Sequence, residues 1–437
     1  MTDVNSVEDS RVYQDDHLIR SLVAQYHSPL YVFDAAAIRA NCRTVKQAVP
    51  YAHLHIRYAC KALSLQAVLK IMLDEGMWID ASSINEVHRA LIAGFTPEQI
   101  YYTGEGATLG VYRDLVERDV LVNCTSIDQI DLLGQAGGTR CSIRINPGEG
   151  HGANTQTNTG GPSSKHGIYF DQLDAAKAAA AQYGIRITAI HSHIGSGTDL
   201  GHWLRIKDKT LDFARGFPDL DTVNLGGGLP VVYNKTNDQP MPIREWGAAL
   251  TQSMQEFSAE MGRDIELQLE PGRFLVANAG VLLAEAQAVK STTNADGSDG
   301  FNFVIVNTGL NHNIRPALYG SYHPIRFIAP KDENRGAPRD YVIAGYLCES
   351  GDVFTVDAAG NLRPRVMDEI RVGDIMVMAG VGAYVHALKS EYNSMNLPAS
   401  VMIMEDGTTR MIERRGTLED VMRREAEVYQ DENAPKI

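Results

Sequence analysis

The sequence predicts an α/β protein in which a (β/α)8 TIM barrel is followed by a C-terminal, mostly-β domain. Three observations predict this class. From about residue 35 to 285, short apolar strands alternate with helical segments, and eight such units in about 250 residues match the size of a barrel. After about residue 285, the helical period stops and strands separated by Gly, Asp and Asn turns follow. A length of 437 residues is also too great for one small core.

The expected domain boundaries lie where these patterns change. We expect the barrel at residues 35–285 and the β domain at residues 1–34 and 286–437. The segment PLYVFD, residues 29–34, is predicted to be a strand that precedes the barrel and pairs with the C-terminal β domain. A doubly wound parallel sheet is the alternative for the first part of the chain, but no G-x-G-x-x-G sequence follows the first strand.

Each barrel unit is predicted from an apolar strand followed by an amphipathic helical run. In the first unit, apolar residues alternate up to Tyr58 and then recur at helical spacing from Leu65 to Leu73, which indicates a buried stripe. Later helical runs include INEVHRALIAGF, DQLDAAKAAAAQY and REWGAALTQSMQEF. The strands are expected to end near Tyr58, Asp80, Thr103, Asn123, Asn146, His193, Leu225 and Glu270.

The β domain is predicted from strand-like runs and a final helix. The runs are VLLAEAQAVKS, FNFVIVNTG, DYVIAGYLC, GDIMVMAGVGAY and ASVMIMEDGTTRMIERRG. The polar sequence TTNADGSDGFN between the first two indicates an exposed hairpin loop. TLEDVMRREAEVYQ has the pattern of a helix with Thr417 as its N-cap.

Composition and charge exclude several classes of function. A formal net charge of −14 argues against binding to a nucleic-acid backbone, which needs a basic face. No apolar run approaches the roughly 20 residues of a membrane span, and the acidic start MTDVNSVEDSRVYQDDHL does not resemble a signal peptide. The five cysteines are scattered and never form a C-x-x-C pair, which indicates free thiols in a reducing compartment and gives no zinc signal. We therefore expect a cytoplasmic protein without a metal site.

The expected strand ends of the barrel carry an unusual set of side chains. Taken singly, each has a common structural explanation: a surface lysine, a core histidine, a flexible glycine turn. Together they match the needs of pyridoxal 5'-phosphate, which are an amine for a Schiff base, backbone N–H donors for a phosphate, a ring to stack on, and a carboxylate to keep the pyridine nitrogen protonated. The set comprises Lys61, Asp80, His193, Gly195, Ser196, Gly226 to Gly228, Glu270 and Arg273.

The β domain adds a second group of candidates. NIRPALYGSYHPI contains Arg315 and Tyr319, CESGDVF contains Cys348 and Glu349, and GAY contains Tyr384. Arginine binds carboxylates with two parallel hydrogen bonds, and glutamate pairs with an ammonium group. A surface salt bridge and a buried structural thiol are the alternatives for these residues.

The chain resembles the diaminopimelate decarboxylase family of fold type III, alanine-racemase-like pyridoxal enzymes. The resemblance covers nearly the whole length and includes NPGEGHG, TNTGGPSSKHGI, HSHIGSG, NLGGGLP, EPGRFLVA, RPALYGSYH, CESGDVF, GAY and the Tyr392–Asn393 pair. It implies a barrel plus a β domain, and a homodimer with shared active sites. It also implies decarboxylation of meso-diaminopimelate at its D centre to L-lysine, within amino-acid biosynthesis.

The resemblance also implies roles for the candidate residues. Lys61 would form the Schiff base, Asp80 would lie near the lysine and the ring, and His193 would stack on the ring. Glu270 would pair with the pyridinium nitrogen, and Cys348 would be the candidate proton donor. Phosphate binding would fall to Ser196, Gly226, Gly227, Gly228 and Tyr384, with Gly272 and Arg273 also at the cofactor. The substrate would meet Arg273, Arg315, Tyr319, Glu349 and Tyr384.

Departures from the family's usual pattern bear on the substrate. They are Leu63, Asn307, His312, Lys389 and Glu391. They leave open a related decarboxylase acting on another diamino acid or a natural-product intermediate. An amino-acid racemase fits the acidic CESGD loop poorly, because it needs a base on each face of the cofactor. A cofactor-carrying binding protein would not be expected to have the second domain.

Overall fold

The computed structural model describes residues 5–150, 159–193, 195 and 197–429, and it divides into two compact units. The barrel unit comprises Asn5 and residues 38–232 and 239–276. The β unit comprises residues 6–37, 233–238 and 277–429. It starts earlier than residue 286 because its long strand β11 (Gly280–Thr293) pairs with strands of the β unit along its first half.

The barrel is a closed ring of eight parallel strands, which confirms the expected fold class. Its order is β2-β3-β4-β5-β6-β8-β9-β10, and β10 pairs back onto β2. The short strand β7 (Ile168–Tyr169) pairs only with β6. The ring strands are β2 (Leu54–Ala59), β3 (Trp78–Ala81), β4 (Ile100–Tyr102), β5 (Leu121–Cys124), β6 (Arg140–Asn146), β8 (Arg186–His191), β9 (Thr222–Asn224) and β10 (Glu266–Leu269).

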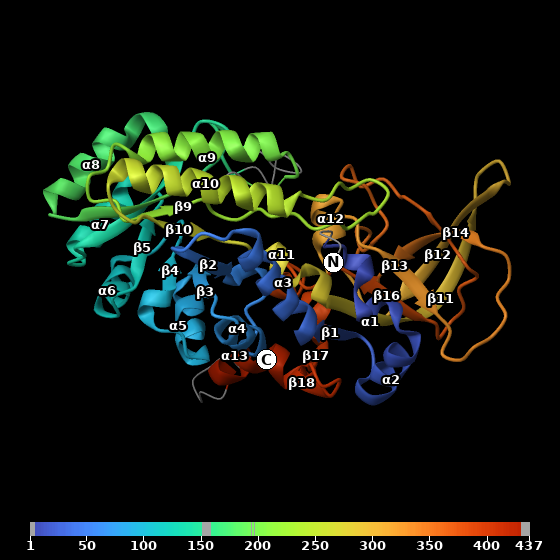
Figure 1. The fold of residues 1–437 in the computed structure, drawn as a ribbon. Helices are drawn as coiled ribbons and strands as arrows, with labels where there is room; N and C mark the ends of the chain where they lie inside the picture. Colours follow the sequence, from blue (N-terminus) through green and yellow to red (C-terminus); the bar gives the residue numbers. More distant parts are fainter. Residues whose placement is uncertain (1–4, 151–158, 194, 196, 430–437) are drawn as a thin grey trace. The chain divides into compact units, whose positions relative to one another are not determined.

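Helices surround the barrel strands, and neighbouring pairs such as α6 and α7, or α9 and α10, pack side by side (Figure 1). The stripe expected after Tyr58 is buried in α4, where Val68, Leu69 and Met72 are not exposed. The helices are α3 (Ala35–Ala48), α4 (Gln66–Asp74), α5 (Ile84–Ala93), α6 (Leu109–Glu117), α7 (Ile127–Gln135), α8 (Leu173–Gln182), α9 (Leu200–Ala214), α10 (Ile243–Met261) and α11 (Arg273–Val276).

The β unit contains one mixed sheet with the path β15-β14-β12-β11-β1-β17-β18, and β16 joins it to β13. The expected strand at residues 29–34 is confirmed as β1 (Leu30–Asp34), which pairs antiparallel with β11 and parallel with β17. The other strands are β12 (Asp299–Val306), β13 (Ile325–Ile328), β14 (Arg339–Ala344), β15 (Arg365–Met367), β16 (Ile375–Ala379), β17 (Ala399–Ile403) and β18 (Thr409–Glu413).

Four helices accompany this sheet: α1 (Arg11–Gln14), α2 (Asp16–Tyr26), α12 (Arg315–Tyr319) and α13 (Leu418–Tyr429). The core forms where α1 and α2 cover the sheet, because Val12, Ile19 and Leu22 pack against apolar residues of β1, β11 and β17. Among the described helices, none combines the length and the apolar character needed to cross a bilayer.

Candidate active site

Four strands of the barrel lead to buried polar side chains at one end of the ring. Asp80 lies in β3, His191 ends β8, and Asn224 ends β9. Glu270 directly follows β10. All four residues are at most 6% exposed. Because the carboxyl ends of parallel barrel strands meet at one face, these groups share one polar centre.

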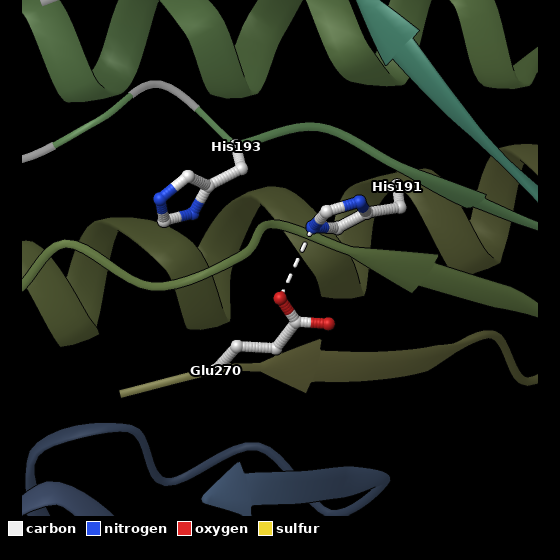
Figure 2. Close-up of side chains that lie close together, drawn as sticks. All are labelled: His191, His193 and Glu270. Atoms are coloured by element: carbon white, nitrogen blue, oxygen red, sulfur yellow. Dashed lines mark ion pairs between the residues drawn. The ribbon is translucent and has the colours of Figure 1, made fainter. Parts of the chain in front are cut away.

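The carboxylate of Glu270 has polar partners on two sides, and Figure 2 shows the one from His191. Nδ2 of Asn224 donates to Oε1 at 2.7 Å, and Nε2 of His191 lies 3.2 Å from Oε2. On the other side of the ring, Nδ2 of Asn123 lies 3.0 Å from Nδ1 of His191. Because an amide NH2 group can only donate, Nδ1 accepts and the ring carries its proton at Nε2, facing Glu270.

These contacts decide the ionisation of the pair. Burial by itself raises the pKa of Glu270, but His191, His193 and the Asn224 amide outweigh it and hold the pKa below its usual value. Burial lowers the pKa of His191, so the neutral ring faces the carboxylate. The pKa of Glu270 is lowered even when the His191 ring is neutral, since an imidazole N–H and an amide N–H still stabilise the anion.

Asp80 has the opposite ionisation. Burial, followed by the nearby charge of Glu270, raises the pKa of Asp80 to about 8, while the charge of Lys61 opposes the rise. Its Oδ1 is buried and makes no hydrogen bond to any residue that the structure describes. The site therefore combines a carboxylate at Glu270 with a carboxylic acid at Asp80 at neutral pH, and the acid has an unused oxygen.

The Gly226–Gly228 turn follows β9 and approaches two other strand ends closely. Gly226 and Gly228 have φ of 68° and 106°. A Cβ on Gly227 would lie 2.1 Å from the carbonyl oxygen of Glu270, and a Cβ on Gly228 would lie 1.9 Å from that of Gly195. No residue with a side chain fits there, so the turn exposes backbone where a phosphate would bind.

Two of the three glycine N–H groups are used within the protein. Gly226 donates to Oδ1 of Asn224 at 2.8 Å, and Gly227 donates to Nδ1 of His193 at 2.9 Å. Within the described residues, the N–H of Gly228 stays available for a bound anion. The Gly227 contact also fixes the orientation of the His193 ring, whose buried position lowers its pKa well below the usual value.

The ligand atoms of His191, His193 and Glu270 lie within 4.8 Å of one another, a spacing that could hold a metal ion (Figure 2). The proton positions argue against this use. Nδ1 of each ring accepts a hydrogen bond, from Asn123 and from Gly227. Each neutral ring therefore carries its proton at Nε2, which leaves no lone pair there for a metal. The donor set fits an organic cofactor better than a metal ion.

Lys61 and Arg144 bring positive charge to the same end of the barrel. Lys61 lies in the single turn Cys60–Ala62 directly after β2, and its exposed side chain is near enough that its charge lowers the pKa of His193. Arg144, in β6, is buried, and its NH2 makes no hydrogen bond within the described part of the chain. Glu105, which contacts His166 and lies 3.9 Å from Arg144, balances that charge.

The β unit holds its candidates in two local groups. The guanidinium of Arg315 lies 5.5 Å from the ring centre of Tyr319, and Arg315 is only 9% exposed. The Cys348 N–H donates to Oδ1 of Asn393 at 3.1 Å. Oε2 of Glu349 accepts from the hydroxyl of Tyr392 at 3.1 Å. Tyr384 has a left-handed φ of 59°, whereas Ser196 lies outside the described residues.

Several residues of the polar centre were not predicted as site residues. They are Asn123, His191, Asn224, Arg144, Glu105 and His166. A signal for three of them is present in the sequence, because Asn123, His191 and Asn224 are polar residues at the ends of otherwise apolar strands. Their pairing across the ring depends on the closure of the barrel.

A family model described as the pyridoxal binding domain of pyridoxal-dependent decarboxylases matches residues 35–277. The chain is 35% identical over 418 residues to a diaminopimelate decarboxylase of Escherichia coli K12, covering 93% of this chain and 96% of that protein. It is 37% identical over 423 residues to the diaminopimelate decarboxylase of Streptomyces coelicolor, covering 94% and 92%.

Solved structures agree with these relatives. A crystal structure of a diaminopimelate decarboxylase superposes with a TM-score of 0.88 and 34% identity, covering 96% of this chain and 99% of that chain. A Helicobacter pylori diaminopimelate decarboxylase complexed with L-lysine gives a TM-score of 0.82 and 28% identity, covering 93% and 99%.

Proposed function

The chain belongs to the diaminopimelate decarboxylase family of pyridoxal-dependent enzymes, and we propose that it removes the D-centre carboxyl group of meso-diaminopimelate, giving L-lysine and CO2. The observation that carries this proposal is the ionised, buried Glu270 beside a glycine turn that tolerates no side chain. This arrangement suits a protonated pyridine ring with a phosphate. The similarity over more than nine-tenths of each chain supports the substrate.

Pyridoxal 5'-phosphate, when bound, supplies an acceptor for the electron pair that is left when the carbon–carboxyl bond breaks. The residues of the barrel would hold it in place. Lys61 would bind it covalently through Nζ until the substrate amine takes its place. Glu270 would keep a proton on the pyridine nitrogen, and His193, oriented by Gly227, would pack on the ring face. Asp80, a neutral acid, would donate a hydrogen bond from its buried carboxyl group.

The phosphate would be bound by backbone and hydroxyl donors. The N–H of Gly228 is available within the described residues, whereas those of Gly226 and Gly227 shape the turn. The remaining phosphate or cofactor contacts are proposed for Ser196, Gly272, Arg273 and Tyr384. Because backbone donors have fixed positions, they hold the anion without the conformational entropy loss of long side chains.

Residues of the β unit, together with Arg273 of the barrel unit, would select the substrate and return a proton to it. Arg315, with Tyr319 and Arg273, would bind the distal carboxylate, and Glu349 would bind the distal ammonium group. Cys348 would donate a proton to the substrate carbon that has lost CO2. Both local groups lie in the β unit, apart in sequence from the barrel residues.

We further propose that the enzyme is a cytoplasmic homodimer, with each active site shared between the barrel of one subunit and the β unit of its partner. The five cysteines are all free, four of them buried, which suits a reducing compartment. The family resemblance supports the shared site. Mixing a Lys61→Ala subunit with a Cys348→Ala subunit tests it, because mixed dimers would regain one complete site and up to half of the activity per such dimer.

The departures from the family pattern are largely absorbed by local structure. Asn307 donates to Oγ of Ser28 and accepts from the backbone of Glu285, both at 2.8 Å. Leu63 is fully buried. His312 is fully buried, and burial brings its pKa to about 3. Residues committed to such contacts leave the substrate choice to Arg315 and Glu349, which favours meso-diaminopimelate over other diamino acids.

The direct test is incubation of the purified, cofactor-loaded protein with meso-diaminopimelate, with CO2 and L-lysine measured. L-lysine, L-ornithine and LL-diaminopimelate serve as comparison substrates in parallel reactions. We expect turnover on meso-diaminopimelate alone. A fully loaded protein that is inactive on it, or faster on a comparison substrate, would refute the proposed substrate and leave a related decarboxylase in its place.

A further inference from the structure

The segment from Tyr384 to Ser394, which we call the 384–394 segment, has an unusual backbone. Among the described residues other than glycine, five have positive φ, and three of these lie in this segment: Tyr384 at 59°, Asn393 at 57° and Ser394 at 56°. A left-handed backbone is unfavourable for residues that carry a Cβ, so it persists only where surrounding contacts impose it. The 384–394 segment must therefore be held by its neighbours.

One neighbour is a half-buried polar cluster of the β unit. Nζ of Lys389 donates to both carboxylate oxygens of Glu413, at 2.7 and 2.6 Å. Nε2 of His386 lies 2.7 Å from Oε2 of Glu413, and the buried Ser400 donates to the same oxygen at 3.0 Å. The Lys389 side chain is only 12% exposed. The cluster therefore ties two points of the segment to β17 and β18.

The neighbours of Glu413 keep it ionised. Burial raises the pKa of Glu413, but His386 and Lys389 outweigh it and bring the pKa to about 2. An ionised Glu413 keeps its partners bound across the pH range of an enzyme assay. Removing one partner of a partly buried pair leaves the other uncompensated, which makes the pair sensitive to single substitutions.

The other end of the 384–394 segment holds the loop that contains Cys348 and Glu349. Oδ1 of Asn393 accepts from the Cys348 N–H, and the Tyr392 hydroxyl donates to Oε2 of Glu349, each at 3.1 Å. Cys348 and Glu349 are exposed, and these are the contacts from the segment that orient them. The segment therefore helps to place the Cys348 backbone and the Glu349 carboxylate, together with contacts inside the loop such as the Gly351 N–H to Oε1 of Glu349 at 3.2 Å.

We propose that Lys389, through its ion pair with Glu413, is a positioning residue that holds the 384–394 segment in the conformation that places Cys348 and Glu349. Lys389 is one of the departures from the usual family pattern, and its charge is used inside the β unit rather than on the substrate. This inference rests on the proposed function, in which Cys348 returns a proton and Glu349 binds an ammonium group.

The test compares Lys389→Met, Lys389→Arg and Glu413→Gln as cofactor-loaded enzymes. Cys348 is the exposed cysteine and the other four are buried, so iodoacetamide reports on Cys348 without any need for turnover. We expect Lys389→Met and Glu413→Gln to change the alkylation rate of Cys348 severalfold across the pH profile and to lower kcat/KM about 10-fold or more. Lys389→Arg, which retains the cation, should keep both the alkylation rate of Cys348 and kcat/KM near those of the parent enzyme.

Two further variants test the contact to Cys348 and the contact to Glu349 separately. Asn393→Gly tolerates the left-handed φ but removes the acceptor for Cys348, so it should alter alkylation and kcat. Tyr392→Phe removes only the hydroxyl that orients Glu349, so it should raise KM with kcat retained. Both remain informative if Lys389→Met fails to fold.

The matched control is Lys290→Met, an exposed lysine of β11 with no ion pair among the described residues. It should leave kcat/KM and Cys348 alkylation unchanged. The inference is overturned if Lys389→Met matches the parent enzyme in both readouts, or if Lys290→Met changes them equally. If alkylation changes as expected but meso-diaminopimelate is not turned over, the proposed function fails while the positioning by Lys389 stands.

Discussion

Replacing Glu270 by glutamine is the sharpest test of the active site. Glutamine keeps the shape of the side chain but removes the negative charge, and its NH2 group would face the Nε2–H of His191. Solvent does not screen the charge of this carboxylate in the parent enzyme, because Glu270 is only 6% exposed. The substitution therefore removes the charge with little change in packing and leaves two donors facing each other at His191.

The magnitude follows from the loss of one partner of a buried charge pair. Glu270 is a desolvated anion that accepts a hydrogen bond from Asn224, and a proton on a bound pyridine nitrogen would depend on that anion. Removing one partner of such a pair costs about 3 to 5 kcal/mol. A loss of that size in the transition state corresponds to a fall of about 10²-fold or more in kcat/KM.

The assay measures kcat and KM for meso-diaminopimelate, and the absorption spectrum of the bound cofactor confirms loading. The matched control is Glu266→Gln, the half-exposed first residue of β10, whose Oε1 lies 3.6 Å from Nε2 of His55. It should change kcat/KM by less than about twofold, since exposed ion pairs contribute little. A loaded Glu270→Gln enzyme with kcat/KM near that of the control would refute the role of the carboxylate.

Three further predictions concern the same site. Lys61→Ala should abolish the visible absorption band of covalently bound cofactor, and persistence of that band would show that another group binds it. Gly228→Ala should weaken cofactor binding, measured by equilibrium dialysis, because its Cβ would lie 1.9 Å from the carbonyl oxygen of Gly195. The control is Gly262→Ala, which is also at positive φ but in open space and should leave cofactor binding intact. Equal cofactor binding by the two variants would contradict the predicted clash. The pKa of Asp80 is about 8 in the folded state, so between about pH 4 and 8 Asp80 is protonated in the folded state and ionised in the unfolded state, and its contribution to stability falls as pH rises. Asp80→Asn should remove this dependence and raise the Tm of the cofactor-free protein more at pH 8 than at pH 5. An equal change of Tm at both pH values would contradict the assignment.

The elements of the fold were largely predictable because their signals are local. The alternation up to Tyr58 and the helical spacing from Leu65 describe one strand and one helix without reference to the rest of the chain. The eightfold repeat of such units then favours a barrel. The start of the β unit at residue 277 was less predictable, since β11 begins as an apolar run like a barrel strand and is distinguished only by its pairing.

The site residues show the same division. Lys61, Asp80, His193 and Glu270 were predictable as candidates, because their residue types at strand ends supply the chemistry of one cofactor. The ionisation of Asp80 and Glu270 was not, since two carboxyl groups have similar intrinsic pKa values and are separated only by their surroundings. Nor did the sequence indicate that Lys389, a departure from the family pattern, pairs with Glu413.

The sequence by itself determined which elements form, which family the chain belongs to, and which side chains are available for chemistry. All of these depend on residue type and on spacing along the chain. Only the tertiary structure decided that Asn123 fixes the proton on His191, that Asn224 and His191 keep Glu270 ionised, and that Lys389 holds the 384–394 segment. The physical reason is that hydrogen bonds and charges act over a few ångströms, and those distances exist only after residues far apart in the chain have been brought together.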